Sequence, residues 1–154
     1  MTVWFVDTSV FCNLLPVPGF DQHRAEVAAE YRDKLTRREA LILPVTAVVE
    51  TGNFIAQLAD GRMRRQTATS FTGVLRLVVQ GRAPWRLHEF PWGVDFLSRL
   101  LDGAGSGSTL VEHAANKLGA GDLCVLTERQ TYAQRTGLGD VRIWTRDKAL
   151  AGYS

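Results

Sequence analysis

Short runs of β-forming residues alternate with longer segments of helical periodicity, and this alternation limits the possible folds more than any other feature of the chain. The predicted strands are residues 2–6 and the runs ALILPV, WRLHEF and VRIWT. Strands that alternate with helices favour a mainly parallel sheet, because parallel neighbours need long crossover connections. We therefore expect an α/β protein whose central sheet has helices on both faces.

Helical segments are predicted between the strands and after the last one. A short helix follows residue 6 and ends before Pro16, because proline disrupts a helix interior. The other helices are predicted at 21–39, 46–58, 63–79, 92–101, 109–118 and 122–134, with a last helical turn at 148–151. The glycine-rich run DGAGSGST is predicted to be a loop.

The composition is that of an ordinary globular protein. The chain has 154 residues, enough for one domain with a substantial core, and 45% of them are hydrophobic. The net charge is only +2, so nucleic-acid binding cannot be argued from the total charge. Arg62, Arg64 and Arg65 cluster in GRMRR, a pattern typical of a solvated helix face or of a contact with phosphate groups.

The cysteines, the histidines and the hydropathy argue against several other classes of protein. Cys12 and Cys124 are expected to be buried free thiols, and the histidines at 23, 88 and 113 share no metal-ligand spacing. No apolar run approaches the roughly 18 residues that a membrane span needs. No basic region precedes the first apolar run, as a signal peptide would require. We therefore expect a cytoplasmic protein that makes no membrane contact.

Two aspartates follow predicted strands directly. Asp7 ends the run VWFV, and Asp147 follows VRIWTR. In open α/β sheets, ligands bind beyond the carboxyl ends of the strands, where the strand order reverses. Each aspartate taken alone is equally typical of a helix N-cap.

Two further acidic residues lie on helices. Glu50 shares a helical face with Ala47, Phe54 and Leu58, and burying it there is costly unless it pairs with an arginine or binds a cation. Asp122 starts a helix and is also a candidate N-cap. Taken together, four convergent carboxylates would repel one another, so they favour a divalent cation such as Mg²⁺ or Mn²⁺. Such an ion activates water and neutralises phosphoryl charge.

Four motifs that carry these residues resemble the PIN-domain family, in particular the VapC-type toxins of bacterial toxin–antitoxin pairs. The motifs are VDTSVF, VTAVVETGNFI, GAGDLCVL and IWTRDKAL, in that order over nearly the whole chain. The resemblance implies a single PIN-like domain over 1–154, with a three-layer α/β/α fold and a central sheet of four to five strands. It implies catalytic, metal-binding carboxylates at Asp7, Glu50, Asp122 and Asp147, supported by Thr8, Ser9 and Thr145.

The function implied by the resemblance is a Mg²⁺- or Mn²⁺-dependent endoribonuclease, the toxin of a pair, inhibited by a cognate antitoxin and forming a homodimer. Candidate contacts to the RNA backbone are Arg62, Arg64, Arg65 and Arg146. Apolar residues of the first helix, Phe11, Leu14 and Leu15, are candidates for a partner contact or for core packing. No β-forming run follows Asp147, so we expect the family's final edge strand to be absent or very short. Residues 85–109 match no motif of the family.

The alternative from another functional class is a catalytically inactive PIN-like module that binds RNA or protein. A dinucleotide loop would need glycine where Ser108 stands. A haloacid dehalogenase-type phosphatase would need an acid at Ser9, and a phospho-receiver domain would need a lysine at a strand end. No histidine lies in a motif beside a serine or cysteine nucleophile.

Overall fold

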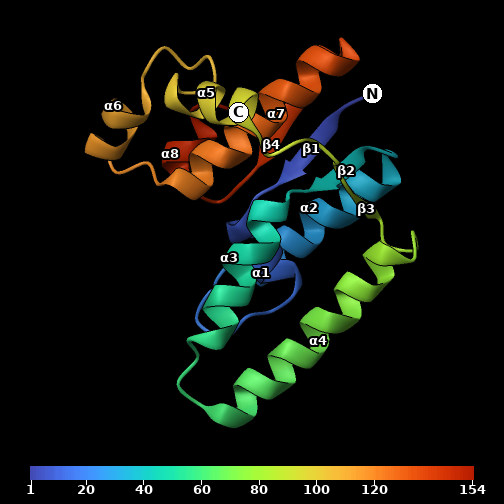
Figure 1. The fold of residues 1–154 in the computed structure, drawn as a ribbon. Coiled ribbons are helices and arrows are strands. Elements are labelled where there is room, and N and C mark those ends of the chain that lie inside the picture. The colour runs from blue at the N-terminus through green and yellow to red at the C-terminus, as the bar shows by residue number, and fades with distance from the viewer.

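Four short strands form one sheet in the order β3-β2-β1-β4, and every neighbouring pair is parallel (Figure 1). The computed structural model describes residues 1–154. The strands are β1 (Val3–Val6), β2 (Ala40–Leu43), β3 (Trp85–Leu87) and β4 (Val141–Trp144). The sheet thus confirms the expected α/β class and a strand number within the predicted range.

Eight helices connect and follow the strands. They are α1 (Thr8–Leu14), α2 (Arg24–Thr36), α3 (Val45–Ala56), α4 (Gly61–Val79), α5 (Val94–Leu101), α6 (Leu110–Ala115), α7 (Ala120–Thr136) and α8 (Lys148–Ala151). Every predicted helix is present. None of the eight is both long and apolar enough to cross a membrane.

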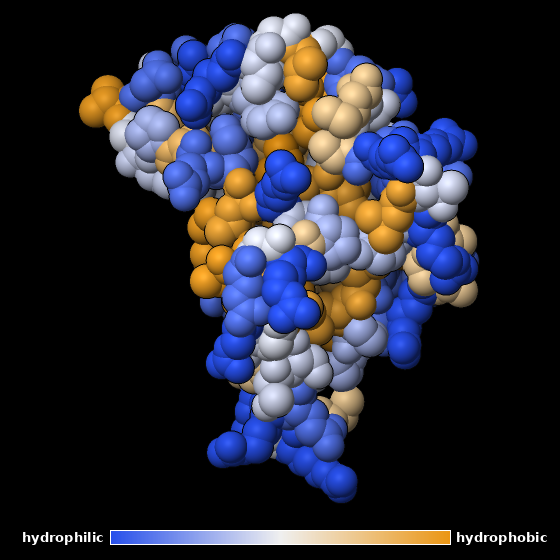
Figure 2. All heavy atoms as spheres, turned by 90° about the vertical axis from the view of Figure 1, so that its right-hand side faces the viewer, coloured by the Kyte–Doolittle hydropathy of each residue, from blue (hydrophilic) through white to orange (hydrophobic).

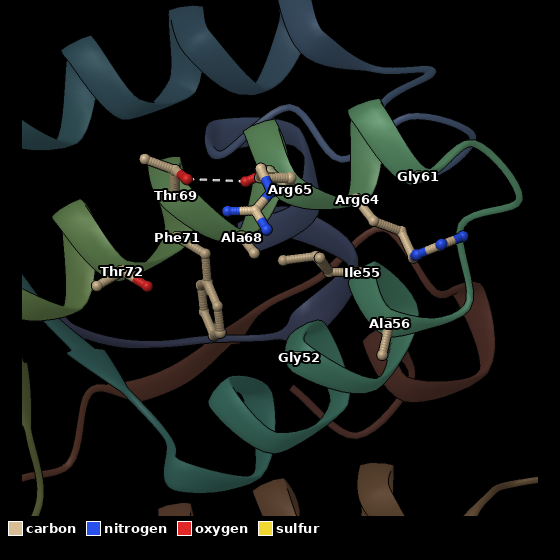
Figure 3. A pocket seen from close by; sticks show the side chains of 10 residues that line it. All are labelled: Gly52, Ile55, Ala56, Gly61, Arg64, Arg65, Ala68, Thr69, Phe71 and Thr72. Carbon is tan, nitrogen blue, oxygen red and sulfur yellow. Dashed lines mark hydrogen bonds between the residues drawn. The ribbon is translucent and has the colours of Figure 1, made fainter.

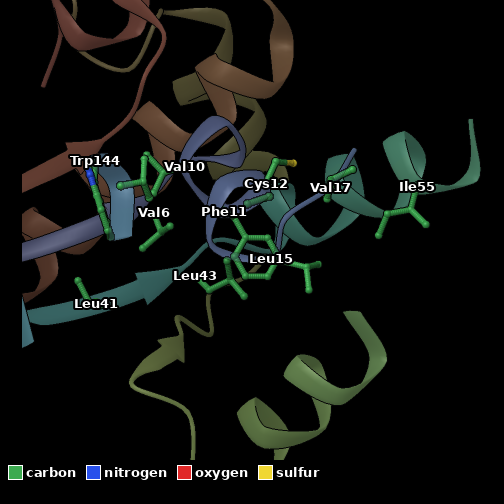
Figure 4. Close-up of a cluster of buried hydrophobic side chains, with 12 residues drawn as sticks. Val6, Val10, Phe11, Cys12, Leu15, Val17, Leu41, Leu43, Ile55 and Trp144 are labelled. Atoms are coloured by element: carbon green, nitrogen blue, oxygen red, sulfur yellow. The ribbon is translucent and has the colours of Figure 1, made fainter. Parts of the chain in front are cut away.

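The sheet buries a separate apolar cluster on each face, which makes the fold a three-layer α/β/α sandwich. Along β1, Val3 and Phe5 point into one cluster, while Val6 points into the other, as the two-residue period of a strand requires. The cluster that contains Val6, called the first cluster below, packs against α1 to α4 (Figure 4). The second packs chiefly against α7 and α8, and Figure 1 shows α5 and α6 on the same side.

The first helix contributes to the core, not to a contact surface. Phe11 is fully buried and Leu15 is 6% exposed, and both belong to the first cluster (Figure 4). Leu14 is half-buried and packs against the same cluster. Of the two interpretations of these residues, core packing is therefore the one that the structure supports.

No fifth strand follows β4, as predicted, and side chains occupy its outer edge. The hydroxyl of Ser154 accepts a hydrogen bond from the Ile143 N–H at 3.0 Å and donates one to the Ile143 carbonyl at 2.9 Å. The Arg129 guanidinium donates to the Val141 carbonyl at 3.4 Å. Three outward-facing backbone groups of this edge strand are thus satisfied from within the chain.

The strand order brings two chain segments together at one end of the sheet. The chain runs from β1 through β2 to β3 on one side, and then returns to place β4 on the other side of β1. Val6 pairs with Trp144 at the ends of these two strands, and the Asp7 N–H donates to the Trp144 carbonyl at 2.9 Å. Asp7 and the residues after Trp144 therefore meet where the strand order reverses.

Candidate active site

Four carboxylates from four separate elements line one cavity of about 290 Å³. Asp7 lies between β1 and α1, Glu50 on α3, Asp122 in the first turn of α7, and Asp147 immediately before α8. These are the four residues predicted from the sequence. No lysine, arginine or histidine forms an ion pair with any of them, so the predicted alternative of an arginine partner for Glu50 is wrong.

Asp7 is 2% exposed and is held by hydroxyl groups. Its Oδ2 accepts hydrogen bonds from the Ser9 hydroxyl and the Thr145 hydroxyl, both at 2.7 Å. Asp7 is also the N-cap of α1, because Oδ2 accepts a hydrogen bond from the Ser9 N–H at 3.4 Å. Oδ1 is buried and has no hydrogen-bond partner. Capping and lining the cavity are thus compatible, because the two tasks use different oxygens.

Glu50 reaches the same cavity from α3. Its Oε1 accepts a hydrogen bond from the Thr8 hydroxyl at 2.7 Å. Gly121, beside Asp122, leaves room for this carboxylate, since a Cβ there would lie 2.6 Å from Oε2 of Glu50. The glycine therefore permits the beginning of α7 to approach α3 closely.

The two remaining aspartates differ in their backbone roles. Asp147 is the N-cap of α8, and it accepts from the N–H groups of Ala149 and Leu150. The Thr145 hydroxyl accepts from the Asp147 N–H at 3.0 Å. The N-cap of α7 is Gly119, so the capping interpretation of Asp122 is wrong and its carboxylate is free for other contacts.

Burial and mutual repulsion disfavour negative charge in this cavity. The pKa of Asp122 is raised to about 7, first by burial, then by the charges of Asp7, Asp147 and Glu50, and last by a hydrogen bond from its neutral form to Asp147. The pKa of Glu50 is raised by burial and by Asp7, against the opposing effect of its hydrogen bond from Thr8. Near neutral pH the cluster therefore retains a proton that a cation would displace.

The side chains fit a hard divalent cation by their chemistry. All four offer carboxylate oxygens, which Mg²⁺ and Mn²⁺ prefer, and Asp7 Oδ1 lacks any other partner. No three acidic, histidine or cysteine side chains are arranged as a ready-made metal centre. The carboxylates surround the cavity and would have to close around an ion.

Further residues of the cavity were not predicted from the sequence. Asn13, Phe20, Gln22 and His23 line it together with Phe54. Asn13 follows Ser9 by one helical turn and donates to the Ser9 carbonyl at 2.7 Å. The run VPGF is typical of a tight turn and could have predicted the turn that carries Phe20, but not that its ring packs beside the site.

The predicted RNA-binding arginines fall into two groups. Arg146 lines the acidic cavity, and its guanidinium donates to Glu30 at 2.7 Å. Arg62, Arg64 and Arg65 lie in the first turns of α4, and none lines the acidic cavity. Helix α4 begins at the lower end of the molecule in Figure 1, and Figure 2 shows that this end is hydrophilic. The structure therefore does not bring these three together with the carboxylates.

A second cavity of about 600 Å³ lies between α3 and α4 (Figure 3). Ile55, Ala68 and Phe71 form part of its wall. Arg64 at its end donates to the carbonyls of Leu58 and Ala59 at 2.7 and 3.1 Å, so it fastens the turn between the two helices.

One serine–histidine contact was missed from the sequence. The Ser106 hydroxyl lies 2.7 Å from Nε2 of His113, which is 2% exposed. No carboxylate pairs with His113, and Ser106 also bonds to the backbone of Ser108. The pair fastens the glycine-rich loop to α6 and does not form a catalytic triad.

Comparisons with known proteins add no assignment. No family model matches the chain, and neither a curated protein nor a solved structure matches it.

Proposed function

We propose that the protein is a metal-dependent endoribonuclease of the PIN-domain type, resembling the VapC toxins of toxin–antitoxin pairs. One observation carries the proposal: four carboxylates from four elements share one cavity, and none of them has a basic partner. A purely structural cluster of this kind would be costly, because like charges raise one another's energy without compensation. The cluster is therefore best explained by a cationic ligand.

The proposed ligands are Asp7, Asp122 and Asp147, with Glu50 as a ligand directly or through water. A bound Mg²⁺ or Mn²⁺ would supply an activated water and neutralise charge on the scissile phosphate. Asp7 is held in place by two hydroxyl donors and offers its free Oδ1. Asp122 has to lose its proton, and although its pKa is raised, a value of about 7 still permits this near neutral pH. The resemblance implies products with a 5′-phosphate and a 3′-hydroxyl.

The proposed partners follow from the same resemblance. A cognate antitoxin would cover the acidic cavity, and Arg62 and Arg65 would contact the RNA backbone. Since phosphate contacts release counterions, Arg62→Ala should reduce the salt dependence of RNA binding. An unchanged salt dependence would show that Arg62 does not contact the RNA backbone. Phe11 and Leu15 are buried and are not accessible to a partner. We therefore place the proposed homodimer contact on the exposed apolar side chains of α5.

The test is an RNA cleavage assay with Mg²⁺ and with Mn²⁺. Asp7→Asn and Asp122→Asn should lower the cleavage rate at least about 100-fold, since each removes charge from the proposed ion site. Asp102→Asn is the matched control, because Asp102 is exposed and makes no side-chain hydrogen bond or ion pair. This control should cleave like the wild type.

Equal metal-dependent cleavage by all four proteins would refute the site assignment. If the wild type binds RNA or a protein but does not cleave, the inactive binding module replaces the nuclease. A neighbouring gene for a small acidic, DNA-binding protein would support the toxin role over that of a housekeeping nuclease.

A further inference from the structure

A rigid turn carries an aromatic side chain to the acidic cavity. In Val17–Pro18–Gly19–Phe20, the Phe20 N–H donates to the Val17 carbonyl at 2.9 Å, and Gly19 has φ +85°. Proline at the second position and a positive-φ glycine at the third are what a type II turn requires. Val17 is fully buried, so the turn is anchored in the core.

The ring of Phe20 is fixed by a second aromatic ring. It stacks on Phe54 of α3 with ring centroids 4.4 Å apart and an angle of 7° between the planes. Both rings line the same cavity as the four carboxylates. Although one side of Phe20 is covered in this way, 39% of the residue remains exposed.

An exposed, immobilised aromatic ring is the feature that proteins use to bind unpaired bases. Stacking of a base on an aromatic side chain depends little on base identity, because every base has a π-face. Fixing the ring beforehand lowers the entropy lost on binding. The adjacent polar groups are partly used within the protein: Gln22 donates to the Gly19 carbonyl at 2.6 Å, and Asn13 Oδ1 accepts from the His23 N–H at 2.8 Å.

We infer that Phe20, backed by Phe54, is the stacking platform for an unpaired base next to the scissile phosphate, so that the substrate is single-stranded RNA. This inference rests on the proposed nuclease function, because it is that function which places a phosphate among the carboxylates. A base within a duplex is already stacked on both sides and cannot reach such a platform without unpairing. Discrimination between single-stranded and paired RNA thus follows from the ring.

The experiment measures the binding of a short fluorescent RNA by anisotropy, once as a single strand and once as a duplex. The buffer contains Ca²⁺ but no Mg²⁺ or Mn²⁺, and a gel verifies that the RNA stays intact. Phe20→Ala should weaken single-strand binding about 5- to 150-fold and leave duplex binding unchanged. Phe20→Leu keeps apolar bulk without a π-face and should weaken binding nearly as much. Phe20→Trp should retain binding, and RNA should quench its emission more than that of the wild type.

Leu35→Ala is the control, because Leu35 is also 39% exposed but lies on α2, outside the cavity. It should bind like the wild type, and thermal unfolding of each variant separates lost stacking from lost folding. Single-strand binding by Phe20→Leu at the wild-type level, or an equal loss for duplex and single strand, would overturn the inference.

The two proposals fail in different measurements. If the wild type does not cleave with Mg²⁺ or Mn²⁺ while single-strand binding still depends on Phe20, the nuclease is refuted, and Phe20 remains a base-binding platform without a scissile phosphate beside it. If the wild type cleaves and Phe20→Leu cleaves and binds single strands equally well, only the platform is refuted. Absence of any single-strand binding by the wild type refutes the platform, whatever the cleavage assay shows.

Discussion

The side chain of Glu128 is fully buried on α7, although it lies outside the acidic cavity. Neither of its oxygens has a hydrogen-bond partner, and Nδ1 of His88 lies 3.4 Å from Oε1. His88 is packed among Phe5, Phe90 and Tyr132. Burial raises the pKa of Glu128 to about 8, while burial and then Arg135 lower the pKa of His88. Both shifts favour neutral groups, so we describe the contact as a neutral pair and not as an ion pair.

This burial predicts a stability that falls as pH rises. The unfolded chain releases the Glu128 proton near the ordinary pKa of 4.5, whereas the folded protein holds it to about 8. The native state therefore binds more protons between these values, and stability decreases across that window. Glu128→Gln should remove a loss on the order of 4 kcal/mol between pH 5 and pH 9, measured by urea unfolding at both values.

Glu89→Gln serves as the control for this measurement, because Glu89 is exposed and its side chain makes no hydrogen bond or ion pair. Its pH dependence should parallel that of the wild type. If Glu128→Gln also parallels the wild type, Glu128 is ionised in the native state.

At the scale of residues, the sequence predicted the four carboxylates that share the acidic cavity but not the other side chains that line it. Asp7 and Asp147 were predictable because they end strands, and Glu50 because it interrupts an apolar helical face. Glu128 was not predictable, because α7 has mixed polarity and its periodicity does not tell which polar side chain turns inward. Phe20 was missed for a related reason: a turn sequence predicts the turn but not the helix on which its side chain packs.

Helices α3 and α7 approach each other where Gly121 faces Glu50. We expect Gly121→Ala to displace the Glu50 carboxylate, because the added Cβ would lie 2.6 Å from Oε2. If the proposed nuclease is correct, the cleavage rate should fall at least about 10-fold, since misplaced ligands lose much of the catalytic effect. The melting temperature should change little, because Gly121 is in a helix, where alanine is favoured.

Gly119→Ala is the matched substitution two residues earlier. A Cβ at Gly119 meets nothing within 4 Å, and the residue has φ −72°, which any amino acid can adopt. Cleavage should remain at the wild-type rate. Equal rates for both variants would show that the position of Glu50 is immaterial to the reaction.

At the scale of elements, helix existence was predictable and helix ends were not. Helix α2 stops at Thr36, three residues before the predicted end, and Arg38 beyond it has φ +56°. Helix α6 stops at Ala115, and Lys117 has φ +66°. Neither arginine nor lysine marks a left-handed position in a sequence, since glycine and asparagine usually take that role. Each end is closed by a local hydrogen bond across that residue: the Glu39 N–H donates to the Lys34 carbonyl at 3.0 Å, and the Leu118 N–H to the His113 carbonyl at 2.9 Å.

The molecule as a whole leaves an apolar surface on α5. Val94, Leu97 and Leu101 are 87%, 55% and 54% exposed and share one face of the helix. In the proposed homodimer this face would be covered by a second copy, so light scattering should give twice the chain mass and Leu97→Glu should lower it to one. Val79→Glu, at an 82% exposed position of α4, should leave the mass unchanged. A wild type with the mass of one chain would refute the dimer.

The strand order could not be read from the sequence, although the layers could. Alternating strands and helices predict a parallel sheet with two covered faces, and the two apolar clusters confirm it. Periodicity does not say on which side of β1 the last strand lies. That placement decides whether Asp147 lies beside Asp7. The prediction that the two aspartates are neighbours therefore came from the four motifs taken together and not from the periodicity.

The hydroxyl of Ser154 has a consequence for how the molecules behave in a crowded solution. A bare edge strand invites a strand of another chain to extend the sheet, which is a common route to fibrils and to swapped oligomers. Because Ser154 and Arg129 occupy the outer hydrogen-bonding groups of Ile143 and Val141, that border of the sheet offers little template for growth. The protection comes from two side chains and not from an additional strand.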